Sequence, residues 1–361
     1  SAFSVMEEAY RESRSGDLAE RMAEIHLERN NYRSAVPYIE TLLEEDPTNE
    51  NLKLRLSLVY WQLKWHDKAR LLLTDLMERF PASSEIAFYL GELEVERKDL
   101  DGALVYYKKI SPEYSKYDQM VSRVTYLFRQ QKRYEEAEKF LESAMGHRPD
   151  AVAFYPLLAA LFEDQGRLPE ARRALEKGEK QFPTDENILY YLGFVYDRAG
   201  DKAKGLATME RLLNVNPDNA NALNFVGYSL LEKGQELDRA GELLKRAMEL
   251  KPGDAFVLDS YGWLLYRQGK GREAMRQLEK ALALKPEEGV IAEHLGDVYV
   301  SLNLPLKAMA VYQRAHKAGG DQEFVNRVAG KMENLQRSLA DRAGPPARAQ
   351  ALGERVPASG R

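Results

Sequence analysis

Eight prolines recur at almost constant intervals along the chain. They are Pro47, Pro81, Pro112, Pro149, Pro183, Pro217, Pro252 and Pro286, separated by 34, 31, 37, 34, 34, 35 and 34 residues. A period near 34 residues indicates one supersecondary unit copied head to tail. Each unit of such an array packs only on its neighbours, so a chain of 361 residues needs no single large core. The spacing therefore predicts a repeat solenoid.

The residues between the prolines repeat as well, in nine consecutive frames. The frames start at Gly16, Glu50, Ser84, Asp118, Val152, Glu186, Ala220, Ala255 and Gly289. A glycine stands at the eighth position in five of them, and an alanine stands at the twentieth position in most. Small residues at both places let two helices approach closely, and the proline ends the second helix because it cannot continue the hydrogen-bond ladder. Each frame therefore reads as a pair of helices.

The frame from Glu186 carries Leu192, Gly193, Tyr196 and Pro217 at these positions. This pattern resembles the tetratricopeptide repeat, whose signature is aromatic-x2-Leu-Gly-x2-Tyr, then Ala-x3-Phe, an Ala and a Pro. The resemblance covers residues 16–320. It implies an all-α fold, a right-handed α-solenoid of helix-turn-helix repeats with terminal capping helices.

The frames predict the organisation of the chain. We expect an N-terminal helix over residues 1–15 (a cap or the remnant of a repeat), repeats 1–3 over 16–112 and repeats 4–9 over 113–320. A capping helix over 321–342 and a disordered tail over 343–361 follow. Two irregularities occur in the middle of the chain: the third repeat loses three residues before Pro112, and Pro156 falls inside the first helix of the fifth repeat, where it should kink or delay that helix.

Composition excludes several kinds of function. The net charge of −5 argues against general binding of nucleic acid or anionic membranes, and no apolar run reaches the roughly 18 residues of a transmembrane span. The chain has no cysteine, so it lacks disulfides, thiolate metal sites and a cysteine nucleophile. The five histidines are far apart in sequence and read as solvated or half-buried structural residues. We expect no catalytic residue, no metal and no cofactor.

In tetratricopeptide arrays the first helices line a concave groove, through positions 2, 5, 6, 9, 12 and 13 of each frame. Carried over to this chain, the resemblance implies a partner-binding groove rich in aromatic residues, Arg and Asn, the types that anchor interfaces. Its residues are Asn187, Tyr190, Tyr191, Phe194, Arg198, Asn221, Asn224, Phe225, Tyr228, Trp263, Tyr266 and Arg267. A secondary groove is formed by Arg55, Trp61, Phe88, Tyr89, Arg123 and Tyr126. The alternative is that tight curvature packs these rings against adjacent repeats.

The favoured function is a non-enzymatic scaffold that holds a protein or peptide partner in the groove of residues 187–267. The chain is similar to bacterial cell-envelope tetratricopeptide proteins, often lipid-anchored, that assist secretion, pilus, polysaccharide or motility assemblies. That likeness implies the periplasm or cell envelope, with the cytoplasm as the alternative. Two other functions stay open: a self-associating scaffold that docks the Phe3/Tyr10 helix or the 321–341 helix into another copy, and the substrate-recruiting region of a larger enzyme such as a glycosyltransferase.

Overall fold

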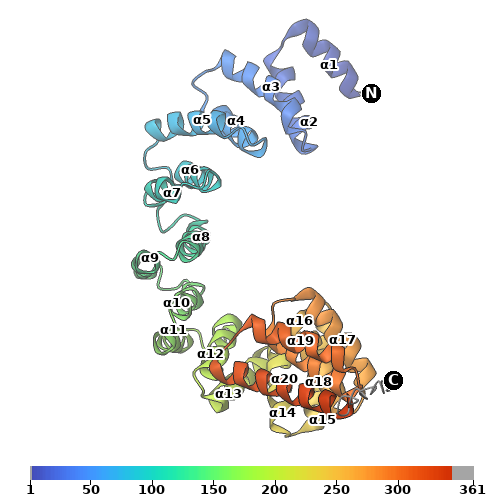
Figure 1. The fold of residues 1–361 in the computed structure, drawn as a ribbon. Helices are drawn as coiled ribbons and strands as arrows, with labels where there is room; N and C mark the ends of the chain where they lie inside the picture. The colour runs from blue at the N-terminus through green and yellow to red at the C-terminus, as the bar shows by residue number, and fades with distance from the viewer. Residues whose placement is uncertain (1, 344–361) are drawn as a thin grey trace, which may run out of the picture. The chain divides into compact units, whose positions relative to one another are not determined.

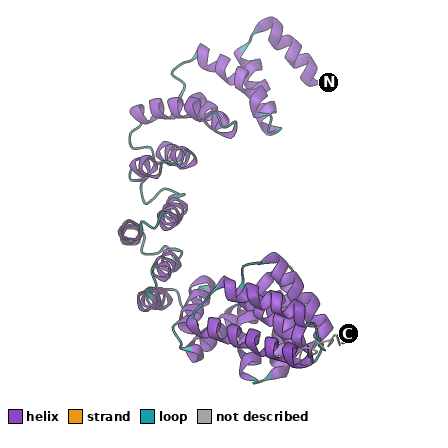
Figure 2. Ribbon diagram, viewed as in Figure 1, coloured by secondary structure: helices purple, strands orange, loops and turns teal. Residues whose placement is uncertain are grey.

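The computed structural model describes residues 2–343 of the chain, with the side chains of residues 5–341. These residues form twenty α-helices and contain no strand (Figure 2). They divide into two compact blocks, an N-terminal block of residues 1–181 and a C-terminal block of residues 182–361 (Figure 1). Within each block, antiparallel helix pairs follow one another along the sequence, which confirms the predicted all-α solenoid fold.

The N-terminal block holds the N-terminal helix and repeats 1–5. Its helices are α1 (Ala2–Ser13), α2 (Gly16–Glu28), α3 (Tyr32–Glu45), α4 (Glu50–Gln62), α5 (His66–Arg79), α6 (Ser84–Glu96), α7 (Leu100–Tyr107), α8 (Tyr117–Gln130), α9 (Tyr134–His147), α10 (Phe154–Asp164) and α11 (Leu168–Gln181). The C-terminal block holds repeats 6–9 and a final helix. Its helices are α12 (Glu186–Arg198), α13 (Lys202–Val215), α14 (Ala220–Lys233), α15 (Leu237–Leu250), α16 (Ala255–Arg267), α17 (Gly271–Leu284), α18 (Gly289–Ser301), α19 (Pro305–Ala318) and α20 (Gln322–Ala343).

Local sequence sets where the helices begin and end. Several first helices start at a side-chain cap: Asp185 accepts a hydrogen bond from the Ile188 N–H at 2.9 Å, which satisfies a donor that the first helical turn leaves free. Seven of the second helices end two residues before a periodic proline. Asn216, which precedes Pro217, has φ −135° and ψ 95°, because a proline excludes helical geometry from the residue before it.

The glycines at the eighth position bring the two helices of a repeat together, as predicted. A Cβ placed on Gly262 would lie 2.8 Å from Cγ of Leu278, and one placed on Gly91 would lie 2.2 Å from Cε1 of Tyr107. Both distances are well below the 3.5–4.0 Å of ordinary carbon contacts. A side chain at either glycine would therefore force the second helix away from the first.

The turn between the two helices of each repeat contains a residue in the left-handed conformation, and the turn of repeat 7 contains a second one, Glu236. In repeats 5–8 the recurring residue is a glycine, whereas in repeats 1–4 and 9 it is an asparagine or lysine. The residues are Asn30, Lys64, Lys98, Lys132, Gly166, Gly200, Gly234, Gly269 and Asn303. Their spacing of 34 or 35 residues matches the repeat period, so a left-handed residue recurs at the same place in every repeat.

The two predicted irregularities are present. Helix α7 has 8 residues, and residues 108–116 form a loop before α8. Helix α10 begins only at Phe154, with Pro156 in its first turn, where the missing N–H costs no helical hydrogen bond. Pro156 therefore delays its helix rather than kinking it.

The predicted C-terminal helix is α20. Asp321 caps its start, because the Phe324 N–H donates to the Asp321 carboxylate at 2.8 Å.

The compact blocks divide between residues 181 and 182. The predicted separation of repeats 1–3 from repeats 4–9 at residue 112 stays a prediction. Apart from residue 343, the predicted disordered tail lies outside the described residues.

Candidate protein-binding face

Four aromatic side chains of the predicted groove contact one another on helices α12 and α14. Tyr190 lies against Tyr191, with ring centroids 5.4 Å apart, and against Phe194 at 6.2 Å. Phe194 reaches Phe225 of the next first helix at 6.5 Å. We call Tyr190, Tyr191, Phe194 and Phe225 the aromatic patch. Tyr191 is 39% exposed and Phe194 is 43% exposed, so this patch presents ring surface to solvent.

The other predicted rings form a second group farther along the same block. Trp263 lies 4.9 Å from Tyr266 and 4.3 Å from the imidazole of His294, and Tyr228 lies 6.2 Å from that imidazole. The Trp263 Nε1–H donates to Glu232 at 2.8 Å. Tyr228, Trp263 and Tyr266 are half-buried and pack against the core. The packing alternative therefore holds for this ring cluster, while the aromatic patch keeps two exposed rings.

The polar residues of the predicted groove differ in what they contact. Asn221 accepts a hydrogen bond from Lys251 Nζ at 2.8 Å. Asn224 is half-buried, and its Oδ1 is buried without a hydrogen-bond partner among the described residues. Asn187, Arg198 and Arg267 are exposed. Because buried polar atoms are normally hydrogen-bonded, the Asn224 oxygen is the unusual atom of this face.

The predicted secondary groove lies in the N-terminal block and is less open. Trp61 and Tyr89 contact each other with ring centroids 5.8 Å apart, and Tyr89 contacts Phe88 at 5.9 Å. Phe88 is only 5% exposed, so its ring belongs to the core. Arg55 is half-buried. Arg123 forms an ion pair with Glu92 at 3.0 Å, and Tyr126 stands 55% exposed with no aromatic contact among the described residues.

Sequence reasoning missed a buried ion pair behind the ring cluster. His294 on α18 and Asp259 on α16 are both buried, and His294 Nδ1 lies 2.9 Å from Asp259 Oδ1. The expectation that every histidine is solvated or half-buried is wrong for His294. Burial alone would lower the pKa of His294, but attraction to the Asp259 carboxylate outweighs it and raises the pKa above its ordinary value. The sequence does hold a signal for this pair, because Asp259 is at groove position 5 of frame 8 and His294 is at groove position 6 of frame 9.

Helix α20 adds a second charged group to this face. Arg327 donates to Glu293 at 2.8 Å, and Lys331 Nζ lies 2.7 Å from Glu293 and 2.6 Å from Asp297. Burial would raise the pKa of Glu293, but hydrogen bonds from Arg327 and Lys331 outweigh it and lower the pKa to about 2. Because Glu293 and Asp297 occupy groove positions of α18, α20 packs where the first helix of a further repeat would lie.

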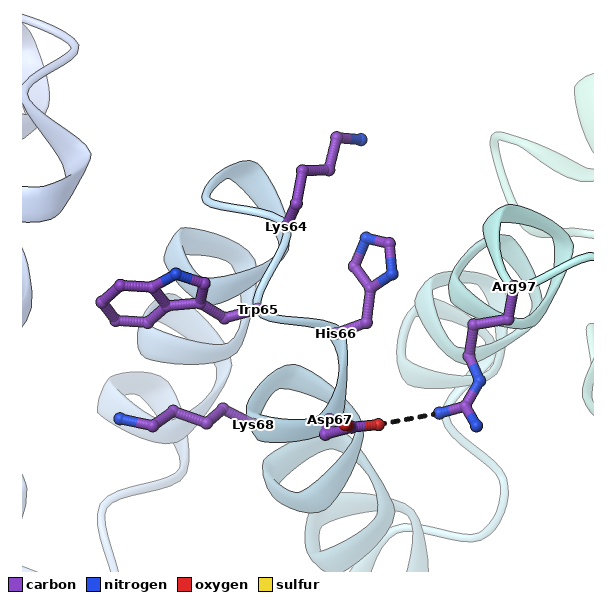
Figure 3. Close-up of a pocket in the computed structure, with 6 residues that line it drawn as sticks. All are labelled: Lys64, Trp65, His66, Asp67, Lys68 and Arg97. Carbon is purple, nitrogen blue, oxygen red and sulfur yellow. Dashed lines mark hydrogen bonds and ion pairs between the residues drawn. The ribbon is translucent and has the colours of Figure 1, made fainter.

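A hollow in the N-terminal block is lined by basic side chains whose charges are already paired. Figure 3 shows Arg97 bonded to Asp67, at 3.2 Å, with Trp65 and Lys68 directed away from Arg97. Lys64 Nζ lies 2.9 Å from Oε2 of Glu96, and His66 Nε2 lies 3.0 Å from the same oxygen. The six side chains that line this hollow do not converge on one point, so we assign no site there.

Within residues 2–343, no helix is long and apolar enough to cross a membrane. The same described part of the chain has no group of three acidic or histidine side chains arranged to hold a metal ion.

The stacked helix pairs and their ring-lined first helices define the chain as a helical-repeat protein. Tetratricopeptide repeat family models match residues 26–87, 128–189 and 164–227, and a second such model matches residues 262–323. Together these matches cover more than half of the chain. The chain belongs to the tetratricopeptide repeat family.

Two curated relatives come from Pseudomonas aeruginosa. The TPR repeat-containing protein PA4667 is 35% identical over 211 residues, which are 58% of this chain and 35% of the relative. The type IV pilus assembly protein PilF is 26% identical over 136 residues, 37% of this chain and 54% of the relative. The chain thus spans about a third and about half of the lengths of these relatives.

One solved structure, a tetratricopeptide repeat protein from Parabacteroides merdae, superposes with a TM-score of 0.52 at 16% identity, covering 70% of this chain and 98% of that one. At this identity, the similarity supports the fold alone.

Proposed function

We propose that the protein is a non-enzymatic scaffold that binds a segment of a partner protein across the aromatic patch of the C-terminal block. The observation that carries the proposal is the exposure of Tyr191 and Phe194 within a group of four contacting rings. Exposed clustered rings offer a large apolar area at low conformational cost, and aromatic residues are typical of interface hot spots.

The polar surroundings of the patch favour an extended segment. Asn187 is exposed on the same helix as Tyr191. An extended peptide offers backbone N–H donors along its length, so the exposed Asn187 amide, one helical turn before Tyr191, can accept a main-chain hydrogen bond beside the rings. Rings then provide affinity, and the amide fixes the register of the segment.

For the cellular role, we propose assembly of a bacterial envelope structure such as a pilus, secretion, polysaccharide or motility complex. The support is the similarity to PilF, which is named for type IV pilus assembly, and to a second Pseudomonas aeruginosa repeat protein. Localisation to the periplasm or envelope belongs to the same proposal.

The test compares two matched double variants. Tyr191→Ala with Phe194→Ala removes the exposed rings of the patch, and Leu250→Ala with Leu284→Ala removes two comparably exposed apolar side chains from second helices of the same block. Quantitative pull-down from the native cell, with circular dichroism as the folding control, should lose a specific partner only for the first variant. Equal partner recovery by both variants would discard the proposed binding face.

A further inference from the structure

The shortened third repeat leaves an apolar cleft on the N-terminal block. The cleft has a volume of about 530 Å³ and lies between α7, α8 and α9. Leu104, Ile110, Met120 and Phe128 form its buried floor, and Phe140 lines it from α9. Phe140 is half-buried, with its ring centroid 6.2 Å from that of Phe128. A volume of this size is within the range of protein ligand sites.

The cleft has a simple origin in helix length. Each of the other second helices has 14 residues, whereas α7 has 8. A shortfall of that size removes about 9 Å of helix at 1.5 Å per residue. The part of α9 that includes Phe140 and Ser143 therefore lacks the neighbouring turns that a full second helix would place beside it.

The charges around the cleft are predominantly positive. Lys108 and Lys139 line it, both exposed, and neither forms an ion pair among the described residues. The one carboxylate in the lining, Glu136, is held by two hydrogen bonds of 2.7 Å from Arg133. An entering segment therefore meets two ammonium groups that form no ion pair among the described residues, and a carboxylate that Arg133 already holds.

We propose that this cleft binds a short amphipathic helix of a partner protein, with Leu or Phe side chains on one face and carboxylates beside them. The helix takes the place of the turns that α7 lacks, its apolar side chains cover Phe140 and the floor, and its carboxylates pair with Lys108 and Lys139. Helix-in-groove recognition uses such apolar anchors, and complementary charge gives it orientation and specificity. This site is separate from the aromatic patch and does not depend on the function proposed for it.

The test uses two labelled twelve-residue helical peptides, one with Leu and Phe on one face and Glu at the edges of that face, and one with every Glu replaced by Lys. Fluorescence anisotropy with the full chain should show the Glu peptide binding at least tenfold more tightly than the Lys peptide. Lys108→Glu with Lys139→Glu should reverse that preference. The matched control is Lys245→Glu with Lys280→Glu, two exposed lysines on second helices of the other block, and it should leave both affinities unchanged.

A second variant tests the cavity itself. Ser143→Trp places an indole at the exposed edge of the cleft and should weaken the Glu peptide at least tenfold while circular dichroism stays unchanged. The proposal is overturned if the Glu peptide does not bind, or if the two peptides bind equally. Concentration-dependent dimerisation that Ser143→Trp abolishes would assign the cleft to a second copy of this chain and would likewise overturn it.

Discussion

Trp263 stacks on His294, with ring centroids 4.3 Å apart and planes inclined by 16°. The stack joins α16 to α18, and the Asp259 carboxylate holds the imidazole from the α16 side at 2.9 Å. Trp263 is thus fixed from both sides, by His294 and by the Glu232 acceptor of its indole N–H. The ring cluster packs against the core of the C-terminal block, whereas the exposed rings of the aromatic patch, Tyr191 and Phe194, both lie on α12.

The His294–Asp259 pair predicts a pH-dependent stability. The folded pKa of His294 is raised above its ordinary value of 6.5, against the effect of burial and because of the Asp259 carboxylate. The stabilisation is therefore complete below pH 6.5 and is lost as the pH rises through the folded pKa. Denaturant unfolding between about pH 5 and 9, followed by Trp263 fluorescence in a Trp61→Phe, Trp65→Phe background, should show stability falling with pH.

The control for that titration is His294→Gln in the same tryptophan background, which keeps a hydrogen-bonding side chain but cannot titrate. It should be less stable at low pH and should lose most of the slope above pH 6.5. A slope that persists unchanged in this variant would show that the pair does not supply the pH dependence.

The ion pairs of Lys331 hold α20 against α18, so their loss should weaken this packing. The Lys331 ammonium group pairs with both Glu293 and Asp297, and the Glu293 side chain is only 3% exposed. Lys331→Met leaves buried carboxylate charge undercompensated and should cost about 3 kcal/mol of unfolding free energy. Hydrogen exchange by mass spectrometry should show faster exchange throughout α20. Arg337→Met is the matched control, because its pair with Glu333 is exposed on both sides and should be worth less than about 0.5 kcal/mol.

The turn residues predict a stabilising substitution. Lys132 has φ +57°, a conformation that costs a residue with a Cβ roughly 1 kcal/mol relative to glycine. Its exposed side chain has no ion pair among the described residues. Lys132→Gly should therefore raise the unfolding free energy of the N-terminal block by up to about 1 kcal/mol in thermal or denaturant unfolding. Gly200→Ala, at φ +86° with open space around the glycine, should change stability in the opposite direction.

Local chemistry explains how much of the fold could be predicted from the sequence. The glycine at position 8 and the periodic proline act within one helix pair, so the frames located the repeats and the loop after Pro112. The length of α7 depends on how residues 108–110 pack, and the cleft beside α9 depends on the neighbouring repeat. Neither follows from a single frame.

The candidate site was predicted less completely for a related reason. Periodicity predicts that both Tyr191 and Trp263 lie on the groove face of a first helix. Trp263 is half-buried because it stacks on His294 of the next first helix, whereas Tyr191 remains 39% exposed. Tyr228 on α14 and His294 on α18 lie 6.2 Å apart although α16 comes between them in sequence. Such contacts depend on the curvature of the stack, which the repeat pattern does not specify.

The most direct test of the binding face is site-specific photocrosslinking in the native cell. Benzoylphenylalanine replaces Tyr191 in one variant and Phe194 in a second, with Leu284 on second helix α17 as the matched exposed control. We predict that both patch positions crosslink to the same partner segment, and that the Leu284 position does not. Equal crosslinking of that segment from Leu284, or none from either patch position while the partner still co-purifies, would contradict the account.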